Sequence, residues 1–121
     1  PSAVSISRTK DAIERMGLTD KIDEPIRRLS GGQQRRVATA RSLAQSPRLI
    51  MADEFLSELD EDTLNSVLFE VTEYVRSNQA ALIVVEHDVS RAKSMADRML
   101  VIDDGRVNPF LSETTALEVN L

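Results

Sequence analysis

The stretch Ser30-Gly31-Gly32-Gln33 stands at the start of a run whose apolar residues have helical spacing. The first turn of a helix presents unpaired N–H groups and the positive end of the helix dipole, so it attracts an anion. Glycines at this point let a phosphate approach the backbone closely. The stretch is therefore a candidate phosphate site, although a serine cap after a flexible joint would explain the same residues.

Two adjacent carboxylates, Asp53 and Glu54, end the run "LIMADE". Asp53 suits a magnesium ion held through water, because magnesium prefers oxygen ligands and keeps several of its waters. Glu54 could polarise an attacking water. An isolated Asp-Glu pair is more often a solvated part of a loop, so this pair alone does not establish a site.

His87, the single histidine, follows a second apolar run and could donate a hydrogen bond to a phosphate oxygen. A lone histidine is more often a surface or core residue than a catalytic one. A basic patch is a further candidate feature, but a solvated helix surface explains its members equally well; they are Arg27, Arg28, Arg35, Arg36 and Arg41.

The elements that must position these residues alternate between helices and strands. Helical spacing predicts helices over residues 9–16, 31–45, from Asp60 or Glu61 to about Arg76, and 89–96. Gly17 is placed to stop the first helix, and Ser30 to cap the second. Short apolar runs predict buried parallel strands over 48–53, 80–86 and 98–103, the last followed by a tight turn.

Strand, helix, strand, helix and strand over 48–103 predict an α/β fold with parallel strands and right-handed crossovers. Polar residues cluster just past the strand ends, at 53–54, 86–88 and 103–104. Ligands bind at the carboxyl ends of strands in open parallel sheets, so the predicted fold gathers the candidate residues at one edge.

Composition narrows the function classes. The 121 residues fit one domain of modest size, and the absence of cysteine excludes a disulfide framework and a thiolate metal site. A net charge of −5 argues against a nucleic-acid surface. No apolar run approaches membrane-spanning length, and the start lacks the apolar stretch of a signal peptide. We therefore expect a soluble protein of a reducing compartment. The chain begins with Pro1 rather than Met, so it could also be a piece of such a protein.

The order of the motifs carries a resemblance. "LSGGQQRR", "RLIMADE", "SELD", "IVVEHD" and "LVIDDGRV" follow one another in register, and together they resemble the second half of an ATP-binding cassette (ABC) ATPase domain, from about Lys10 to Val107. The resemblance implies the C-terminal half of a P-loop NTPase (RecA-like) core together with the end of the family's helical subdomain. The implied division is 1–46 for the end of the helical subdomain with its signature helix, 47–107 for the second half of the nucleotide-binding core and 108–121 for a tail.

The resemblance also implies residue roles. Leu29–Gln33 would be the signature motif, Leu49–Glu54 the Walker B motif, Ser57–Asp60 the D-loop and His87 the switch histidine. In a complete domain the cofactors would be ATP and Mg²⁺, with Asp53 on the metal, Glu54 orienting or deprotonating water and His87 touching the γ-phosphate. Ser30, Gly31, Gly32, Gln33 and Asp60 would bind nucleotide.

The chain departs from the family pattern in three places. Phe55-Leu56 stand where the family usually has Pro-Thr or Pro-Ser after the catalytic glutamate, Glu58 where a small residue is usual, and Glu86 where Thr or Ser precedes the histidine. Glu58 would add charge near the seam of a dimer. These departures weaken the expectation of efficient hydrolysis, but not that of the fold.

The 121 residues contain no G-x-x-x-x-G-K-[ST] loop, the usual phosphate cradle. In the family each ATP lies between two subunits, so the resemblance implies that residues 30–33 grip a nucleotide bound to a partner. We expect the missing P-loop to lie before Pro1 and the chain alone to be inactive.

The favoured interpretation is an ATP-binding and hydrolysing subunit of an ABC transporter, represented by its C-terminal half. Its expected partners are a second nucleotide-binding domain and transmembrane permease subunits, not nucleic acid, at the cytoplasmic side of the inner membrane. As a half-domain it is expected to form homo-oligomers. The alternative is a non-catalytic half-cassette that acts as a regulatory or assembly module.

Overall fold

The computed structural model describes residues 2–109, and these fall into two compact units that divide between Val84 and Val85. Each unit is described by itself. The predicted tail, 108–121, lies outside the described residues from position 110 onward. Within residues 2–109, no helix is both long and apolar enough to cross a membrane.

Helix α1 (Ala3–Arg15) opens the first unit. It begins well before the predicted position at Thr9, because the Ser2 hydroxyl caps it by accepting the Ser5 N–H at 3.1 Å. It ends as predicted near Gly17, which adopts the left-handed φ of 66° that glycine reaches at no steric cost. The cap at Ser2 thus places the start of the helix before the residues whose apolar spacing predicted it.

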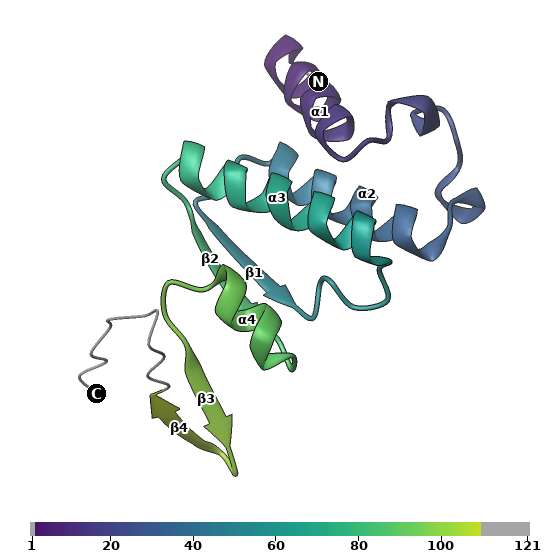
Figure 1. Ribbon diagram of the computed structural model, residues 1–121. Coiled ribbons are helices and arrows are strands. Elements are labelled where there is room, and N and C mark those ends of the chain that lie inside the picture. Colours follow the sequence, from purple (N-terminus) through teal and green to yellow (C-terminus); the bar gives the residue numbers. More distant parts are fainter. Residues whose placement is uncertain (1, 110–121) are drawn as a thin grey trace. The chain divides into compact units, whose positions relative to one another are not determined.

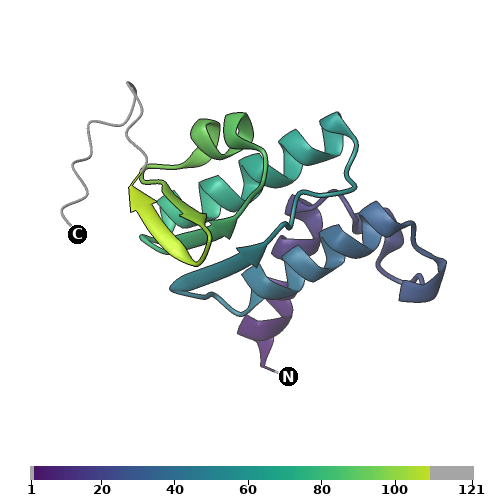
Figure 2. The ribbon, with the colours of Figure 1, turned by 90° about the horizontal axis from the view of Figure 1, so that it is seen from below.

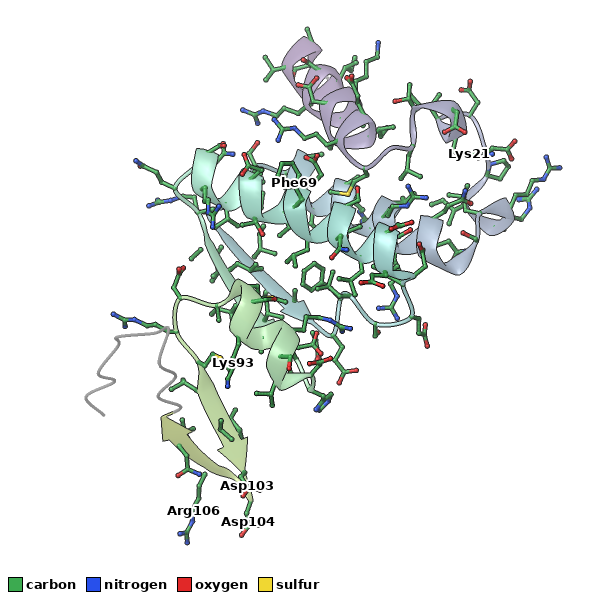
Figure 3. All side chains as sticks on the ribbon, viewed as in Figure 1. Lys21, Phe69, Lys93, Asp103, Asp104 and Arg106 are labelled. Carbon is green, nitrogen blue, oxygen red and sulfur yellow. The ribbon has the colours of Figure 1, made fainter. Side chains whose placement is uncertain are left out.

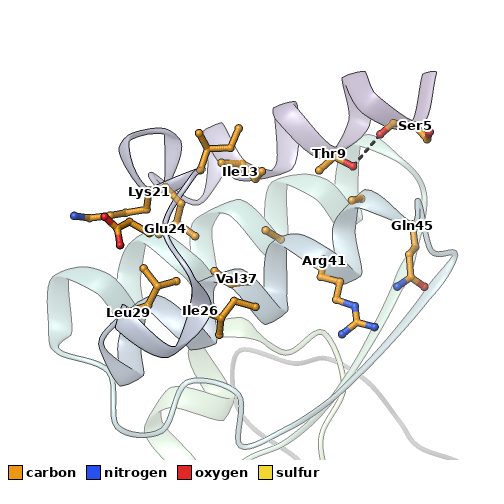
Figure 4. A pocket seen from close by; sticks show the side chains of 14 residues that line it. Ser5, Thr9, Ile13, Lys21, Glu24, Ile26, Leu29, Val37, Arg41 and Gln45 are labelled. Carbon is orange, nitrogen blue, oxygen red and sulfur yellow. Dashed lines mark hydrogen bonds between the residues drawn. The ribbon is translucent and has the colours of Figure 1, made fainter. Parts of the chain in front are cut away.

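Helix α2 (Gly31–Ala44) follows two short 3-10 turns, Thr19–Lys21 and Ile26–Arg28. Helices α1 and α2 pack against each other. The buried apolar residues of these helices and of the segment between them are Ala12, Met16, Leu18, Leu29, Ala40 and Leu43. Arg36 ties the pair together by donating from Nη1 to the Met16 carbonyl at 3.1 Å. An apolar groove of about 480 Å³ remains between α1, the linking turns and α2, with Arg41 on its wall (Figure 4).

Strand β1 (Leu49–Asp53), helix α3 (Glu61–Ser77) and strand β2 (Ala81–Val85) form a strand–helix–strand crossover. The two strands pair in parallel, as predicted, and helices α2 and α3 lie on one side of β1 (Figures 1 and 2). Helix α3 buries Val67, Val71 and Tyr74. The Tyr74 hydroxyl donates to the Pro47 carbonyl at 2.8 Å, which fastens the end of α3 to the chain just before β1.

The prediction that β1 and β2 are buried was wrong for one of their faces. Along both strands exposed and half-buried residues alternate, because the helices cover only one face of the pair. Met51 is 75% exposed and Ile83 is 53% exposed, and Leu49 and Val85 are also exposed. The described residues leave one aliphatic face of β1 and β2 uncovered, whereas the sequence predicted that both strands are buried.

The second unit contains helix α4 (Val89–Met95) and the strands β3 (Leu100–Asp103) and β4 (Arg106–Pro109). The third predicted strand is present as β3, but it pairs antiparallel with β4 in a separate two-stranded sheet rather than extending the parallel one. The predicted tight turn is confirmed: Asp104 and Gly105 both have positive φ, 47° and 69°, as a two-residue turn of type I′ requires (Figure 3). A turn of this kind pairs a strand with the segment that follows it, and β4 was missed because it is short and ends in proline.

Candidate functional site

The start of α2 confirms the predicted cap. The Ser30 hydroxyl accepts the Gln33 N–H at 3.2 Å, and the Gln33 side-chain oxygen accepts the Ser30 N–H at 2.9 Å. This reciprocal pair is a capping box, which fixes the first turn of the helix. Helix geometry leaves the N–H groups of Gly31 and Gly32 without intrahelical partners, so they can serve an external acceptor.

The two glycines are not required by packing within the chain. A side-chain carbon added at Gly31 would meet nothing within 4 Å, and one added at Gly32 would make an ordinary contact, 3.7 Å from Cδ2 of Leu59. Glycine in a helix costs up to about 1 kcal/mol relative to alanine. The missing side chains therefore leave room beside the backbone for a group from outside, which is what the predicted phosphate site needs.

The carboxylates lie where β1 ends. Asp53 is the last residue of the strand and is exposed, and Glu54 is half-buried and adopts a left-handed φ of 48°. The loop that follows turns back at once, since the Ser57 N–H donates to the Glu54 carbonyl at 3.1 Å. Leu56, only 1% exposed, fixes this loop to the core.

Arg35 joins the helix to this loop. Its Nη1 donates to the Glu54 carbonyl at 3.3 Å and to the Ser57 hydroxyl at 3.1 Å, and its Nη2 lies 3.3 Å from Glu58 Oε2. Arg35, Asp53, Glu54 and Ser57 together line a hollow of about 250 Å³. Sequence reasoning placed Arg35 only in a basic patch, because no local signal links it to partners 19 to 23 positions away.

Asp60 caps α3 in this chain. Its carboxylate accepts the Thr63 N–H at 3.2 Å. A side-chain hydrogen bond from Thr63, followed by this backbone bond, lowers the pKa of Asp60 below its usual value. Glu61 and Asp62 add negative charge to the first turn, where the helix dipole favours it. Asp60, which the resemblance assigned to nucleotide binding, thus also stabilises the start of α3.

His87 belongs to the second unit, whereas the other candidate residues belong to the first. Its exposed segment is held by Glu86, whose carboxylate accepts the N–H groups of His87 and Asp88, both at 3.0 Å, and pairs with Arg91 at 3.4 Å. Asp88 in turn caps α4 by accepting the Arg91 N–H at 3.0 Å. Glu86 departs from the Thr or Ser that usually precedes the histidine, and its role as an acceptor for two backbone N–H groups explains the departure. Its side chain is only 9% exposed.

The oxygen atoms around the hollow fit a magnesium ion that arrives with a phosphate. Among residues 2–109, no group of three or more His, Cys, Asp and Glu side chains gathers into a metal site. Magnesium, however, usually takes one or two carboxylates and completes its shell with water and phosphate oxygens. Asp53 and Glu54 line the hollow beside the Ser57 hydroxyl, and such a donor set suits this ion.

The sequence pattern of the family described as "ABC transporter" matches residues 4–57, which include the start of α2 and the end of β1. The lipoprotein-releasing system ATP-binding protein LolD of Maricaulis maris (strain MCS10) is 38% identical over 111 residues, 92% of this chain and 48% of LolD. The L-cystine transport system ATP-binding protein TcyN of Escherichia coli (strain K12) is 36% identical over 107 residues, 88% of this chain and 42% of TcyN. The chain is related to the ATP-binding cassette ATPase domains.

The fold agrees with this family. The structure of an inward-facing conformation of a putative metal-chelate type ABC transporter superposes with a TM-score of 0.80 at 23% identity, over 89% of this chain and 43% of that one. The α/β core with its parallel strand pair is thus that of an ABC ATPase domain. The chain spans about half the length of the curated relatives it matches.

Proposed function

We propose that this chain supplies the second half of an ATP-binding and hydrolysing domain of an ABC transporter. The observation that carries the proposal is the start of α2, where a capped turn presents two glycines that internal packing does not explain. Arg35 joins the same helix to the Glu54 carbonyl and lines one hollow with Asp53 and Glu54. Phosphate binding and water activation therefore draw on neighbouring parts of one unit.

Each candidate site residue would have a separate role in the transfer of a phosphoryl group to water. Ser30, Gln33 and the N–H groups of the two glycines would bind the phosphates of a nucleotide whose P-loop belongs to another subunit. Glu54 would orient the attacking water and accept its proton. His87 would donate a hydrogen bond to the γ-phosphate. Asp53 would hold magnesium, which supplies neutralisation of phosphate charge when it is bound.

The proposed partners follow from what the relatives have in common. They are ATP-binding proteins of transport systems, so we assign a second nucleotide-binding domain and membrane permease subunits as partners, with the chain on the cytoplasmic side of the inner membrane. The relatives are named for different cargoes, lipoproteins in one case and L-cystine in another. The proposal accordingly assigns ATP-driven transport without a particular cargo.

A second candidate function is a non-catalytic half-cassette that acts in assembly or regulation. The open aliphatic face of β1 and β2 favours it, because apolar surface of this kind promotes association without any nucleotide. In this reading Asp53 and Glu54 have no turnover to perform.

Calorimetry with Mg-ATP, combined with a phosphate-release assay, distinguishes the catalytic function from the non-catalytic one. We call this chain together with a P-loop-bearing half, in the same polypeptide or supplied by a partner, the intact cassette. The chain alone is expected to give no tight binding and no phosphate release, because it has no phosphate cradle and no P-loop lysine. The intact cassette is expected to bind Mg-ATP and release phosphate. An intact cassette that assembles but never releases phosphate would favour the non-catalytic module, and steady phosphate release from the chain alone would contradict both readings.

A further inference from the structure

We propose that Arg35 is a positioning residue that holds the loop of residues 54–58 in the conformation from which Glu54 acts. The role rests on the proposed function, because it concerns the placement of the candidate base. It adds to that function a link between the helix that starts at the phosphate site and the strand end that carries the carboxylates.

The contacts of Arg35 converge on this loop. Nη1 donates to the Glu54 carbonyl at 3.3 Å and to the Ser57 hydroxyl at 3.1 Å, while Nη2 reaches Glu58 Oε2 at 3.3 Å. A guanidinium is planar and carries its donors in a fixed fork, so a single side chain can restrain several acceptors at once. Three residues of one short loop are restrained in this way from α2.

The loop needs such restraint because its backbone is strained at both ends. Glu54 has φ of 48° and Glu58 has φ of 62°, and neither is a glycine. Left-handed conformations of this kind are unfavourable for residues with a side chain and persist only where the surroundings fix them. The Ser57 N–H already donates to the Glu54 carbonyl, and Nη1 of Arg35 adds a second donor to the same oxygen. Without Arg35, we expect the loop to relax away from this conformation.

The two bonds made by Nη1 carry the argument, rather than the ion pair. Arg35 is 38% exposed and Glu58 is 84% exposed, so water and salt screen the attraction between their charges. The bonds to the Glu54 carbonyl and the Ser57 hydroxyl are partly buried and act directly on the residues that flank the turn.

The start of helix α2 also lies near Leu59, the residue that follows the loop. Cδ2 of Leu59 lies close enough to Gly32 to contact a side-chain carbon added there, at 3.7 Å. Arg35 holds the loop against α2, and Leu59, the residue after the loop, lies near Gly32 in the first turn of the same helix. A phosphate bound at the first turn of α2 and a water activated by Glu54 would then be placed by one rigid helix.

Hydrogen exchange measured by NMR on the whole 121-residue chain tests the restraint without any need for activity. Arg35→Gln removes the fork, and the matched control Arg41→Gln removes a charge from the same helix at the wall of the apolar groove. In Arg35→Gln the Ser57 amide is expected to exchange about tenfold faster or more, while other amides of α2 keep their protection. Arg41→Gln is expected to leave Ser57 exchange unchanged. Equal Ser57 exchange in the wild type and Arg35→Gln would overturn the proposal.

Steady-state kinetics of the intact cassette test the positioning role. In Arg35→Gln, kcat is expected to fall by about tenfold or more, with the KM for ATP changed by less than about twofold, because the base is misplaced while the nucleotide site is retained. Arg35→Lys should recover only part of kcat, since one ammonium group cannot reproduce the fork. Ser57→Ala keeps Arg35 and removes one of its acceptors, so it should lower kcat by less than Arg35→Gln does.

The outcomes distinguish this inference from the proposed function. A normal kcat in Arg35→Gln, or a rise in KM that accounts for the whole loss, overturns the positioning role and leaves the proposed function intact. A wild-type intact cassette that binds ATP without hydrolysing it overturns the proposed function, and the positioning role with it.

Discussion

Glu54 combines an acidic side chain with a backbone conformation that its type does not favour. Its φ of 48° begins the sharp turn after β1, and its carbonyl accepts both the Ser57 N–H and Nη1 of Arg35. Two donors thus fix the carbonyl of the residue that carries the carboxylate. Strain of this kind is a feature of sites where geometry matters for chemistry.

We predict that Glu54→Gln blocks turnover in the intact cassette while nucleotide binding remains. Glutamine keeps the size and the backbone bonds of Glu54, but its amide cannot accept a proton from water. Phosphate release should fall by about a hundredfold or more, within the range that removal of a general base produces. Calorimetry with Mg-ATP on the same variant supplies the control for binding. Near wild-type phosphate release would show that Glu54 is not the base.

Ser30 and Arg35 show why some site residues could be predicted from the sequence and others could not. The cap at Ser30 depends on Gln33, three positions away, so the local pattern was sufficient and the structure agrees. The partners of Arg35 lie across the fold, at Glu54, Ser57 and Glu58. Only the packing of α2 beside the end of β1 creates that arrangement.

At the scale of elements, the first turn of α2 offers a test that separates a helix cap from a phosphate site. Ser30→Ala is predicted to lower the stability of the chain by about 1 kcal/mol, because it removes the capping bond to Gln33. Gly31→Ala is predicted to raise stability by about 0.5 kcal/mol, since the added carbon meets nothing and alanine favours the helix. Both changes should nevertheless weaken ATP-driven dimerisation of intact cassettes.

Urea unfolding of the chain and light scattering of the intact cassette with ATP measure the two effects. The pair of variants is a matched control, because stability moves in opposite directions while the predicted loss of association is shared. Unchanged ATP-driven dimerisation in both variants would mean that the turn is only a cap.

Helices were predicted more accurately than strand partners for a physical reason. Caps and 3.6-residue spacing are local, so α2 and α3 begin and end close to the expected positions. A strand's neighbours and the covering of its two faces depend on distant segments. The sequence therefore predicted β1, β2 and β3 as strands, but missed the pairing of β3 with β4.

For the whole molecule, the open strand face predicts self-association. Met51 and Ile83 are exposed among the residues that the structure describes, and residues 49–52 and 81–85 contain neither a charged residue nor a proline. We expect a dimer or larger oligomer in the absence of nucleotide, since a symmetric dimer is the commonest closed arrangement. Light scattering across a concentration series is the direct measurement.

Variants assign that association to the strands. Met51→Lys combined with Ile83→Lys should shift the chain towards the monomer, because two charges cannot be buried without cost. Phe69→Lys is the matched control, since it replaces an exposed apolar side chain of α3, 61% exposed, and should leave the oligomer in place (Figure 3). A monomeric wild-type chain at high concentration would refute the prediction.

The hydrogen bond from Tyr74 to Pro47 gives the molecule a built-in optical probe. The chain has one tyrosine and no tryptophan, so its tyrosine absorbance and fluorescence come from a single ring, buried where α3 meets the chain before β1. Breaking the bond to the Pro47 carbonyl exposes that phenol to water and changes its emission. Thermal unfolding followed by tyrosine fluorescence therefore reports the unfolding of the first unit and does not detect the unfolding of the β3–β4 hairpin. Comparison with far-ultraviolet circular dichroism would then reveal whether the two units melt at one temperature or at two.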